Sequence, residues 1–334
     1  MATNKSLRIS RSIFEPQPLA ERIRSKWGWS ETVCEYWSSG FTDTYRVQSK
    51  DYGVSYFRVY PYRWRTRGQI QGEVDLLLYL YQNGAPVSYP LCKSDGSFIE
   101  SIDVPEGRRH AIMFSEAKGA PPRMDRNSSY QYGRIASIVH KLADATEKRF
   151  QRTRLDFDHL VRQPLAHIAL LYGHRTKDFD YLAKLAADLS SAITSLVSNA
   201  SPQFGICHGD LHFNNLHRDN DGGFTLFDFD CCGYGWRSYD VSVFLWSRGA
   251  KFDRRGKFNR THQWNGFIDG YHSIRTLSDE EIQAAYCFVP LRHLWQLGWK
   301  IALRTRHGHR HLSELKFQQD IHFIKNWIRN FKPV

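Results

Sequence analysis

Short segments rich in β-branched and aromatic residues recur through the first third of the chain, separated by turn residues, and this pattern predicts strands. The predicted strands cover residues 33–37, 44–47, 54–60, 97–102 and 109–115, a sheet of about five. An amphipathic helix is predicted before them at 15–26, and another between the third and fourth strands at 69–82. The first third of the chain is therefore predicted to be a sheet with helical additions.

The remainder carries the 3.6-residue spacing of amphipathic helices. Helices are predicted at 128–145, 178–197, 241–246, 278–304 and 312–330, and Pro164 is expected to break the segment between the first two. Two short strands, at 216–218 and 224–227, form a predicted hairpin around an acidic, glycine-rich turn. A sheet region followed by a mainly helical region places the chain in the α+β class.

The strongest chemical signal is the run His208-Gly209-Asp210-Leu211-His212-Phe213-Asn214-Asn215, followed by Phe227-Asp228-Phe229-Asp230. ATP-dependent phosphoryl transfer needs one carboxylate to orient the attacking hydroxyl, and an amide oxygen with a second carboxylate to hold Mg²⁺. Asp210, Asn215 and Asp228 offer these groups in order. In the alternative interpretation, the same residues only bond their own backbone in turns.

This run resembles the H-G-D-x-H-x-x-N…D-[FW]-[DE] signature of the aminoglycoside phosphotransferase/choline kinase-like family, distant relatives of the protein kinases. Two further stretches agree with the resemblance. Met113-Phe114-Ser115-Glu116-Ala117-Lys118-Gly119 is similar to the hinge of aminoglycoside kinases, and Tyr239-Asp240-Val241 resembles their aspartate at a helix start. The resemblance implies a bilobal protein-kinase-like fold. Residues 1–115 would form a small nucleotide-binding lobe, an antiparallel sheet with one helix, and residues 116–334 a large, mainly helical lobe for catalysis and acceptor binding.

The resemblance also implies roles in the second lobe. Asp210 would be the catalytic aspartate, and Asn215 and Asp228 would bind the metal. His208 would fix the loop by hydrogen bonding, whereas His212 would either contact the acceptor or γ-phosphate or be structural. The implied cofactors are ATP and Mg²⁺.

In the first lobe, Arg58 stands where the family usually carries a lysine toward the phosphates. Arginine keeps the charge but presents a planar fork in place of a point charge. Glu73 matches the glutamate that pairs with this cation, although a surface glutamate near a helix N-terminus is the competing interpretation. The resemblance also implies a loop that covers the phosphates, although a plain hairpin turn explains the sequence of this stretch equally well. It further implies a hinge whose backbone groups bond adenine. The loop residues are Ser39, Gly40, Phe41 and Thr42, and the hinge residues are Phe114, Ser115, Glu116 and Ala117.

The roles of two polar residues at or in predicted helices, Asp240 and His140, leave alternatives open. Asp240 is either a helix N-cap or a brace for the catalytic-loop backbone, or both. His140 lies in a predicted helix, where a lone histidine is more often a satisfied structural residue than a catalytic one. Only nine residues separate Asp230 from Asp240, which leaves no room for a protein-kinase activation segment.

The net charge of +12 allows either anionic partners or a basic enzyme with a solvated surface. Basic residues are scattered without a long Lys/Arg run, so no nucleic-acid partner is expected. Six cysteines without metal-type pairing indicate small buried residues in a reducing compartment. No apolar run suits a signal peptide or a membrane span, and a cytoplasmic protein is expected.

The leading hypothesis is a kinase that phosphorylates a small-molecule hydroxyl, acting as a monomer or homodimer. A protein serine/threonine kinase of the bacterial stress-kinase type is the alternative within catalysis, and a nucleotide-binding pseudokinase scaffold, supported only by Arg58, is the alternative outside it. The segment 246–310 contains twelve Lys and Arg but only five Asp and Glu. This excess of positive charge favours a neutral, zwitterionic or anionic acceptor, or a protein.

Overall fold

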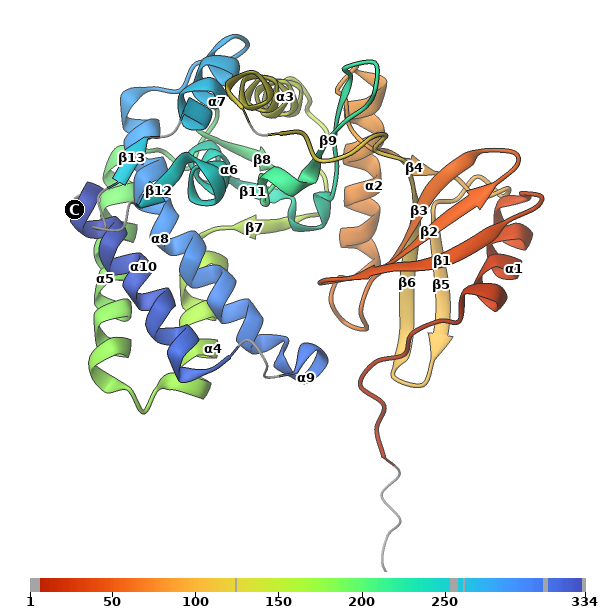
Figure 1. The fold of residues 1–334 in the computed structure, drawn as a ribbon, viewed down its shortest axis with the longest axis horizontal. Coiled ribbons are helices and arrows are strands. Elements are labelled where there is room, and N and C mark those ends of the chain that lie inside the picture. The colour runs from red at the N-terminus through yellow and green to blue at the C-terminus, as the bar shows by residue number, and fades with distance from the viewer. Residues whose placement is uncertain (1–6, 124, 253–257, 261, 309–311, 332–334) are drawn as a thin grey trace, which may run out of the picture. The chain divides into compact units, whose positions relative to one another are not determined.

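The computed structural model describes residues 7–123, 125–252, 258–260, 262–308 and 312–331. The chain forms two compact units (Figure 1). Unit 1 comprises residues 1–118 with 149–151, and unit 2 comprises residues 119–148 with 152–334. Within the described residues, none of the helices has both the length and the apolar character that crossing a membrane requires.

Unit 1 is built on one antiparallel sheet in the order β1-β2-β3-β6-β4, with β5 also paired to β6. The sheet has one strand more than predicted, because β4 is only two residues long and shows no alternation. Helices α1 and α2 complete the unit. The elements are α1 (Pro16–Trp27), β1 (Val33–Ser39), β2 (Asp43–Ser49), β3 (Gly53–Val59), α2 (Arg67–Gln82), β4 (Pro90–Leu91), β5 (Ile99–Val104) and β6 (Gly107–Ser115).

The core of unit 1 follows from strand alternation. Tyr45 and Val47 of β2 and Phe57 of β3 point to one face and are fully buried. Helix α1 covers this face with its apolar stripe, and Trp27 meets the ring of Phe57 edge-on at 5.7 Å between centroids. The strands are therefore held by the helix that the sequence predicted at 15–26.

Unit 2 is mainly helical, with a small sheet in which β11 runs parallel to β7 and antiparallel to β8, and a hairpin of β9 and β10. Together with unit 1 this confirms the α+β class. Its elements are α3 (Arg126–Asp144), β7 (Thr153–Leu155), η1 (Asp158–Arg162), α4 (Gln163–Tyr172), α5 (Thr176–Leu196), β8 (Phe204–Cys207), η2 (Phe213–Asn215), β9 (Leu216–Arg218), β10 (Phe224–Leu226), η3 (Phe229–Cys231), β11 (Gly233–Trp236), α6 (Arg237–Phe244), η4 (Leu245–Gly249), β12 (Ala250–Phe252), β13 (Phe258–Arg260), α7 (His262–His272), α8 (Asp279–Ala302), α9 (Arg304–His307) and α10 (Glu314–Phe331).

The two prolines in helical segments are accommodated differently. Pro164 does not break its segment as predicted: the π-helix η1 continues directly into α4, and Arg162 before it already has helical angles (φ −64°, ψ −49°). Pro290 lies inside α8 and cannot donate to the carbonyl of Tyr286 one turn earlier. The indole N–H of Trp327 on α10 donates to that carbonyl instead, at 3.0 Å. Helix α8 therefore continues through a proline because α10 satisfies the carbonyl that the proline leaves without its usual partner.

Helices α3 and α7 pack with their backbones in close approach. A Cβ added at Gly133 of α3 would lie 1.9 Å from the carbonyl oxygen of Phe267 on α7. A Cβ added at Gly270 of α7 would lie 1.9 Å from the carbonyl oxygen of Tyr130 on α3. Neither neighbour is a side chain that could swing aside, so glycine is required at both positions.

We expect Gly133→Ala to lower the free energy of unfolding by about 1–3 kcal/mol, because the added methyl group forces the two helices apart. Arg134→Ala, on the exposed face of the same helix, is the matched control and should change it by less than about 0.5 kcal/mol. Urea unfolding followed by circular dichroism measures both. Equal stability of the two variants would contradict the close approach.

Candidate active site

The loop after β8 begins with His208, Gly209 and Asp210. Gly209 has φ +80°, and a Cβ placed there would lie 2.2 Å from the carbonyl oxygen of Cys231. Both the left-handed backbone and the contact with Cys231 exclude a side chain. The glycine of the motif thus lets the loop turn directly against the segment that follows Asp228.

The buried carboxylate of Asp240 holds this loop from behind. Its Oδ2 accepts a hydrogen bond from the backbone N–H of His208 at 2.7 Å, and its Oδ1 accepts one from Gly209 at 2.8 Å. Asp240 is therefore the brace that the resemblance implied. It is not an N-cap, because α6 begins three residues earlier and Trp236 occupies the cap position. Burial alone would raise the pKa of the Asp240 carboxyl, but hydrogen bonds from His140 and the His208 backbone lower it overall.

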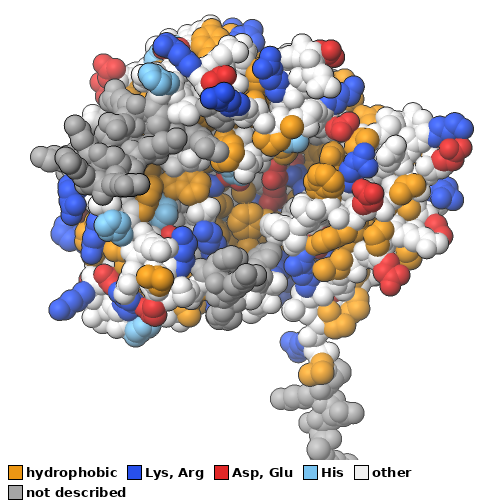
Figure 2. Space-filling view, in the orientation of Figure 1, with side chains coloured by type: hydrophobic (Ala, Val, Ile, Leu, Met, Phe, Trp, Pro, Cys, Tyr) orange, Lys and Arg blue, Asp and Glu red, His pale blue; other side chains and the backbone are white. Residues whose placement is uncertain are grey.

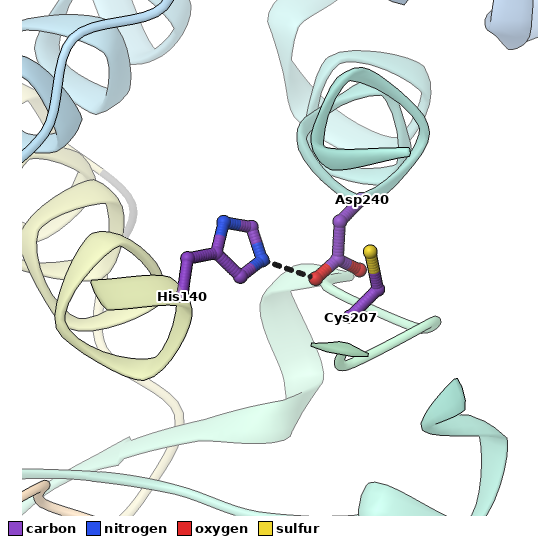
Figure 3. Close-up of side chains that lie close together, drawn as sticks. All are labelled: His140, Cys207 and Asp240. Carbon is purple, nitrogen blue, oxygen red and sulfur yellow. Dashed lines mark hydrogen bonds and ion pairs between the residues drawn. The ribbon is translucent and has the colours of Figure 1, made fainter. Parts of the chain in front are cut away.

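His140 of α3 completes the brace (Figure 3). Its Nε2 donates to Asp240 Oδ2 at 2.8 Å, and its Nδ1 accepts from the hydroxyl of Tyr271 on α7 at 2.7 Å. Full burial lowers the pKa of His140 to about 4, so the ring is neutral. The prediction of a satisfied structural histidine is confirmed.

Cys207 lies beside this pair, and His140, Cys207 and Asp240 are close enough together to suggest a metal site (Figure 3). The bonding argues against one. Both ring nitrogens and both carboxylate oxygens are already engaged. Burial raises the pKa of the Cys207 thiol well above its usual range, and its sulfur lies 3.3 Å from the carbonyl oxygen of Trp236. The cluster therefore supports the backbone of the H-G-D loop through hydrogen bonds.

His208 makes the loop-fixing bonds that were expected of it. Its Nδ1 accepts from the backbone N–H of Asp210 at 3.2 Å, and its Nε2 donates to the carbonyl oxygen of Phe227 at 3.0 Å. The side chain therefore joins the H-G-D loop to the residue just before Asp228.

Asn215 and Asp228 are brought together by the β9–β10 hairpin. The backbone N–H of Phe227 donates to the carbonyl oxygen of Asn215 at 3.0 Å. The side-chain amide of Asn215 donates to the carbonyl oxygen of Asp210 at 2.9 Å, which commits its nitrogen and leaves Oδ1 as its ligand atom. Asp228 is exposed and holds a left-handed backbone (φ 65°, ψ 63°), a conformation costing about 1–2 kcal/mol that the surroundings must enforce. An amide oxygen and a carboxylate suit Mg²⁺.

Arg152 fixes the turn after Asp228, a role that the sequence did not reveal. Its guanidinium donates to the carbonyl oxygens of Cys232 at 2.9 Å, Phe229 at 3.3 Å, and Asp230. The two segments are about 80 residues apart in the sequence, and Arg152 belongs to no motif, so only the fold joins them.

Among the described residues, the side chains of Arg292 and His212 lie closest to the carboxylate of Asp210. Arg292 of α8 donates to its Oδ1, and the Nε2 of His212 lies 3.4 Å from its Oδ2. The Nδ1 of His212 accepts from the backbone N–H of Asn214, and its carbonyl oxygen accepts from the hydroxyl of Tyr132. Burial lowers the pKa of His212. Sequence reasoning named His212 but missed Arg292, which sits in an aromatic-rich helix without a local motif.

In unit 1, the expected Arg58–Glu73 ion pair is present. The hydroxyl of Tyr60 donates to Glu73 at 2.9 Å and accepts from Arg58 at 2.8 Å. The guanidinium of Arg58 also lies over the ring of Phe114, 4.3 Å from its centroid. Glu73 is fully buried, so the surface-glutamate interpretation is wrong.

The loop between β1 and β2 is anchored by residues outside it. Arg11 donates to the hydroxyl of Ser39 at 2.5 Å and pairs with Asp43, the first residue of β2. Gly40 donates to the carbonyl oxygen of Thr42 at 3.0 Å, and Phe41 stacks on Trp64 at 5.4 Å. The loop is a braced hairpin turn, and its contact with phosphates stays a prediction.

The predicted hinge begins at the end of β6. The backbone N–H of Ser115 donates to the carbonyl oxygen of Tyr89, and its own carbonyl oxygen accepts from the hydroxyl of Ser88 at 2.7 Å. The N–H of Ser115 is therefore committed, whereas its carbonyl oxygen keeps a second lone pair, and contact of residues 114–117 with adenine stays a prediction.

The basic residues counted between 246 and 310 are only partly described. Arg254, Arg255, Lys257 and Arg310 lie outside the described residues, as do the side chains of Arg248, Lys251 and Arg260. Of the others, Arg275 lies 3.4 Å from Asp144, and Arg292 pairs with Asp210. Figure 2 shows Lys and Arg dispersed among neutral and acidic side chains on the face drawn. Two of the five described basic side chains are therefore paired within the protein, and the charge that the segment presents to an acceptor stays a prediction.

Comparison with known proteins places these features in a family. A model of the phosphotransferase enzyme family matches residues 34–277. The chain is 31% identical over 319 residues to an uncharacterized protein of Deinococcus radiodurans, covering 95% of this chain and 91% of that protein. The structure resembles amicoumacin kinase hAmiN in complex with AMP-PNP, Ca²⁺ and Ami, with a TM-score of 0.75 at 19% identity, covering 94% of this chain and 93% of that one. It also resembles a microcompartment-associated aminopropanol kinase, with a TM-score of 0.70 at 20% identity and coverages of 94% and 96%.

The chain belongs to the phosphotransferase enzyme family. The family and the kinase-like fold that the resemblance implied are both confirmed. The residue roles and the division into nucleotide-binding and catalytic parts stay predictions.

The neutral, buried His140 predicts a pH-dependent stability. Its pKa is about 4 in the folded protein and about 6.5 when exposed. Between these pH values the unfolded chain binds a proton at His140 and the folded chain does not. The contribution of neutral His140 to the free energy of unfolding is complete above pH 6.5 and is lost as the pH falls toward 4. We expect His140→Gln to flatten the fall in unfolding free energy over this window by up to about 1.4 kcal/mol per pH unit.

Urea unfolding at pH 7, 6 and 5 measures this difference. His272→Gln, an exposed histidine of α7, is the control and should leave the slope unchanged. A His140→Gln slope equal to that of the wild type would mean that His140 takes up its proton equally in the folded and unfolded protein, so that burial does not lower its pKa.

Proposed function

We propose that this protein is an ATP- and Mg²⁺-dependent kinase that transfers the γ-phosphoryl group of ATP to a hydroxyl of a small molecule. The observation that carries the proposal is the arrangement of Asp210, Asn215 and Asp228. The Asn215 side chain bonds the backbone of Asp210, and the hairpin sets Asp228 beside Asn215. If these residues were only turn residues, there would be no reason for a buried carboxylate, Asp240, to bond the backbone of this loop.

In this mechanism Asp210 accepts a hydrogen bond from the acceptor's hydroxyl, aims its oxygen at the γ-phosphorus and takes the proton late. Phosphoryl transfer passes through a loose transition state, so orientation contributes more than base strength. The hydrogen bonds through His208, Asn215 and Asp240 keep the loop in one conformation. Asp210 therefore begins the reaction already in place.

Asn215 Oδ1 and the Asp228 carboxylate would hold Mg²⁺, which supplies charge neutralisation at the phosphates. Unit 1 would bind the nucleotide. Arg58, fixed by Glu73, would neutralise the non-transferred phosphates. The residues from Ser39 to Thr42 would approach the phosphates with backbone N–H groups, and Glu116 and Ala117 would meet adenine.

A small-molecule acceptor is favoured over a protein. The similar structures are an amicoumacin kinase and an aminopropanol kinase, whose acceptors are small molecules. Asp230 is followed within a few residues by β11 and α6, so the chain between them cannot form the peptide platform of protein kinases.

An ATP-consumption screen of the purified protein tests the proposal. Its panel holds amino alcohols, sugars, aminoglycosides, amicoumacin-type compounds and Ser/Thr-containing proteins, each with and without Mg²⁺. ADP production that depends on one small-molecule class and on the metal is the expected result. Phosphorylation confined to proteins would favour the stress-kinase alternative, and nucleotide binding without turnover on any acceptor would favour the scaffold.

We expect Asp210→Asn to lower turnover by at least about a hundredfold and to leave nucleotide affinity nearly unchanged, because it removes the group that orients the hydroxyl. Asp228→Ala is the matched comparison, since it should abolish the Mg²⁺ dependence of nucleotide binding. Initial rates and calorimetric titration with a non-hydrolysable nucleotide separate the two effects. Near-normal turnover of Asp210→Asn would refute the role assigned to Asp210.

Arg58 gives a separate test in unit 1. Arg58→Ala should raise the KM for ATP and lower turnover, because it removes the positive charge and leaves Glu73 buried without this partner. Arg58→Lys keeps the charge and should keep appreciable activity. Thermal melting of each variant separates misfolding from weak nucleotide binding. Wild-type kinetics in Arg58→Ala would show that the phosphates lie elsewhere.

A further inference from the structure

Arg292 of α8 is a buried cation directed at the proposed catalytic carboxylate. Its side chain is 3% exposed, and one terminal nitrogen donates to Oδ1 of Asp210. The other terminal nitrogen lies 3.3 Å from the carbonyl oxygen of Gly209 and 3.3 Å from the hydroxyl of Tyr239. One guanidinium thus contacts both the side chain of Asp210 and the backbone just before it.

The aromatic side chains around Arg292 restrict its movement. Its guanidinium carbon lies 4.4 Å from the ring centroid of Trp295, one turn along the same helix, and 5.5 Å from that of Trp246. A planar cation stacked in this way keeps a fixed orientation. The hydrogen bonds that it donates therefore also fix the direction of the carboxylate.

Such burial is costly unless the charge is compensated. Among the described residues, Asp210 is the only carboxylate within 4.0 Å of Arg292. Arg237 offers a contrast in the same unit. It is also buried, but it donates to the carbonyl oxygen of Ile206 and to Asp144, and so links structural elements. Arg292 is instead paired with a residue of the reaction.

We propose that Arg292 is a positioning residue for Asp210, an inference that rests on the proposed function. It occupies Oδ1 from the buried side and leaves Oδ2, the oxygen on the side of His212, to accept the acceptor's hydroxyl. The fork of the guanidinium reaches Oδ1 and the Gly209 carbonyl together. An ammonium group is a single point of charge and does not match this geometry.

The decisive experiment is chemical rescue. Arg292→Ala should lower turnover by about a hundredfold, because a misdirected base loses the alignment on which transfer depends. The KM for ATP should change by less than about threefold, since Asn215 and Asp228 are untouched. Methylguanidine, at concentrations too low to unfold the protein, should restore at least about tenfold of the lost turnover, and methylammonium should restore less. Asp210→Asn should gain nothing from either compound.

Two further variants complete the test. Lys177→Gln removes an exposed positive charge from helix α5 of the same unit and should behave as the wild type. Arg292→Lys keeps the charge but not the fork, and should retain at most about a tenth of wild-type turnover at normal nucleotide affinity. This variant decides the matter if Arg292→Ala does not fold.

Three results would overturn the inference. The first is turnover of either Arg292 variant within about threefold of wild type. The second is a loss of turnover that only tracks a lower melting temperature, without rescue by methylguanidine. The third is rescue by methylammonium equal to that by methylguanidine. A wild-type protein inactive with every acceptor would instead refute the proposed function itself, so the two failures are distinguishable.

Discussion

The candidate site depends on one buried anion, the carboxylate of Asp240. It lies behind the H-G-D loop and accepts from the backbone N–H groups of His208 and Gly209, while His140 satisfies it from α3. Without this carboxylate, two buried N–H groups would lose their acceptor, and each would cost about 1–3 kcal/mol. Because His140 is in turn bonded to Tyr271 of α7, the conformation of the loop depends on the packing of three helices. The close approach of α3 and α7 at Gly133 and Gly270 therefore also helps to hold the loop of the candidate site.

A second constraint comes from arginines that reach the site from distant parts of the sequence. Arg152 satisfies the carbonyl groups of the turn after Asp228, and Arg292 holds Asp210. Each guanidinium carries several donors in fixed directions, so one side chain can satisfy carbonyl groups that no regular element would pair. These two arginines are therefore engaged inside the protein, and the net charge of +12 does not by itself define the charge of the ligand.

The sequence allowed the local features to be predicted, because they depend on neighbours in the chain. Strand alternation, helix stripes and the spacing of Asp210, Asn215 and Asp228 were all readable, and so was the pairing of Arg58 with Glu73 once the family was recognised. Features that depend on distant partners were not. Asp240 has no sequence mark that separates a brace from a cap, since the difference lies in which backbone N–H groups it meets. Arg292 looks like any basic residue of an aromatic-rich helix until the fold brings it to Asp210.

Helix α8 links Asp210, the proposed base, to its surroundings in a way that the motif alone does not suggest. It presents Arg292 to Asp210 and, one turn later, stacks Trp295 on the same guanidinium. A substitution on this face, made to admit a different acceptor, would also move the cation that directs Oδ2. Turnover and acceptor choice would then change together, even with the H-G-D loop intact. Because α10 stabilises α8 at Pro290 through Trp327, changes far from Asp210 could reach the base by the same route. In the proposed mechanism, acceptor specificity would therefore depend on the packing of α8 as well as on the residues that touch the acceptor.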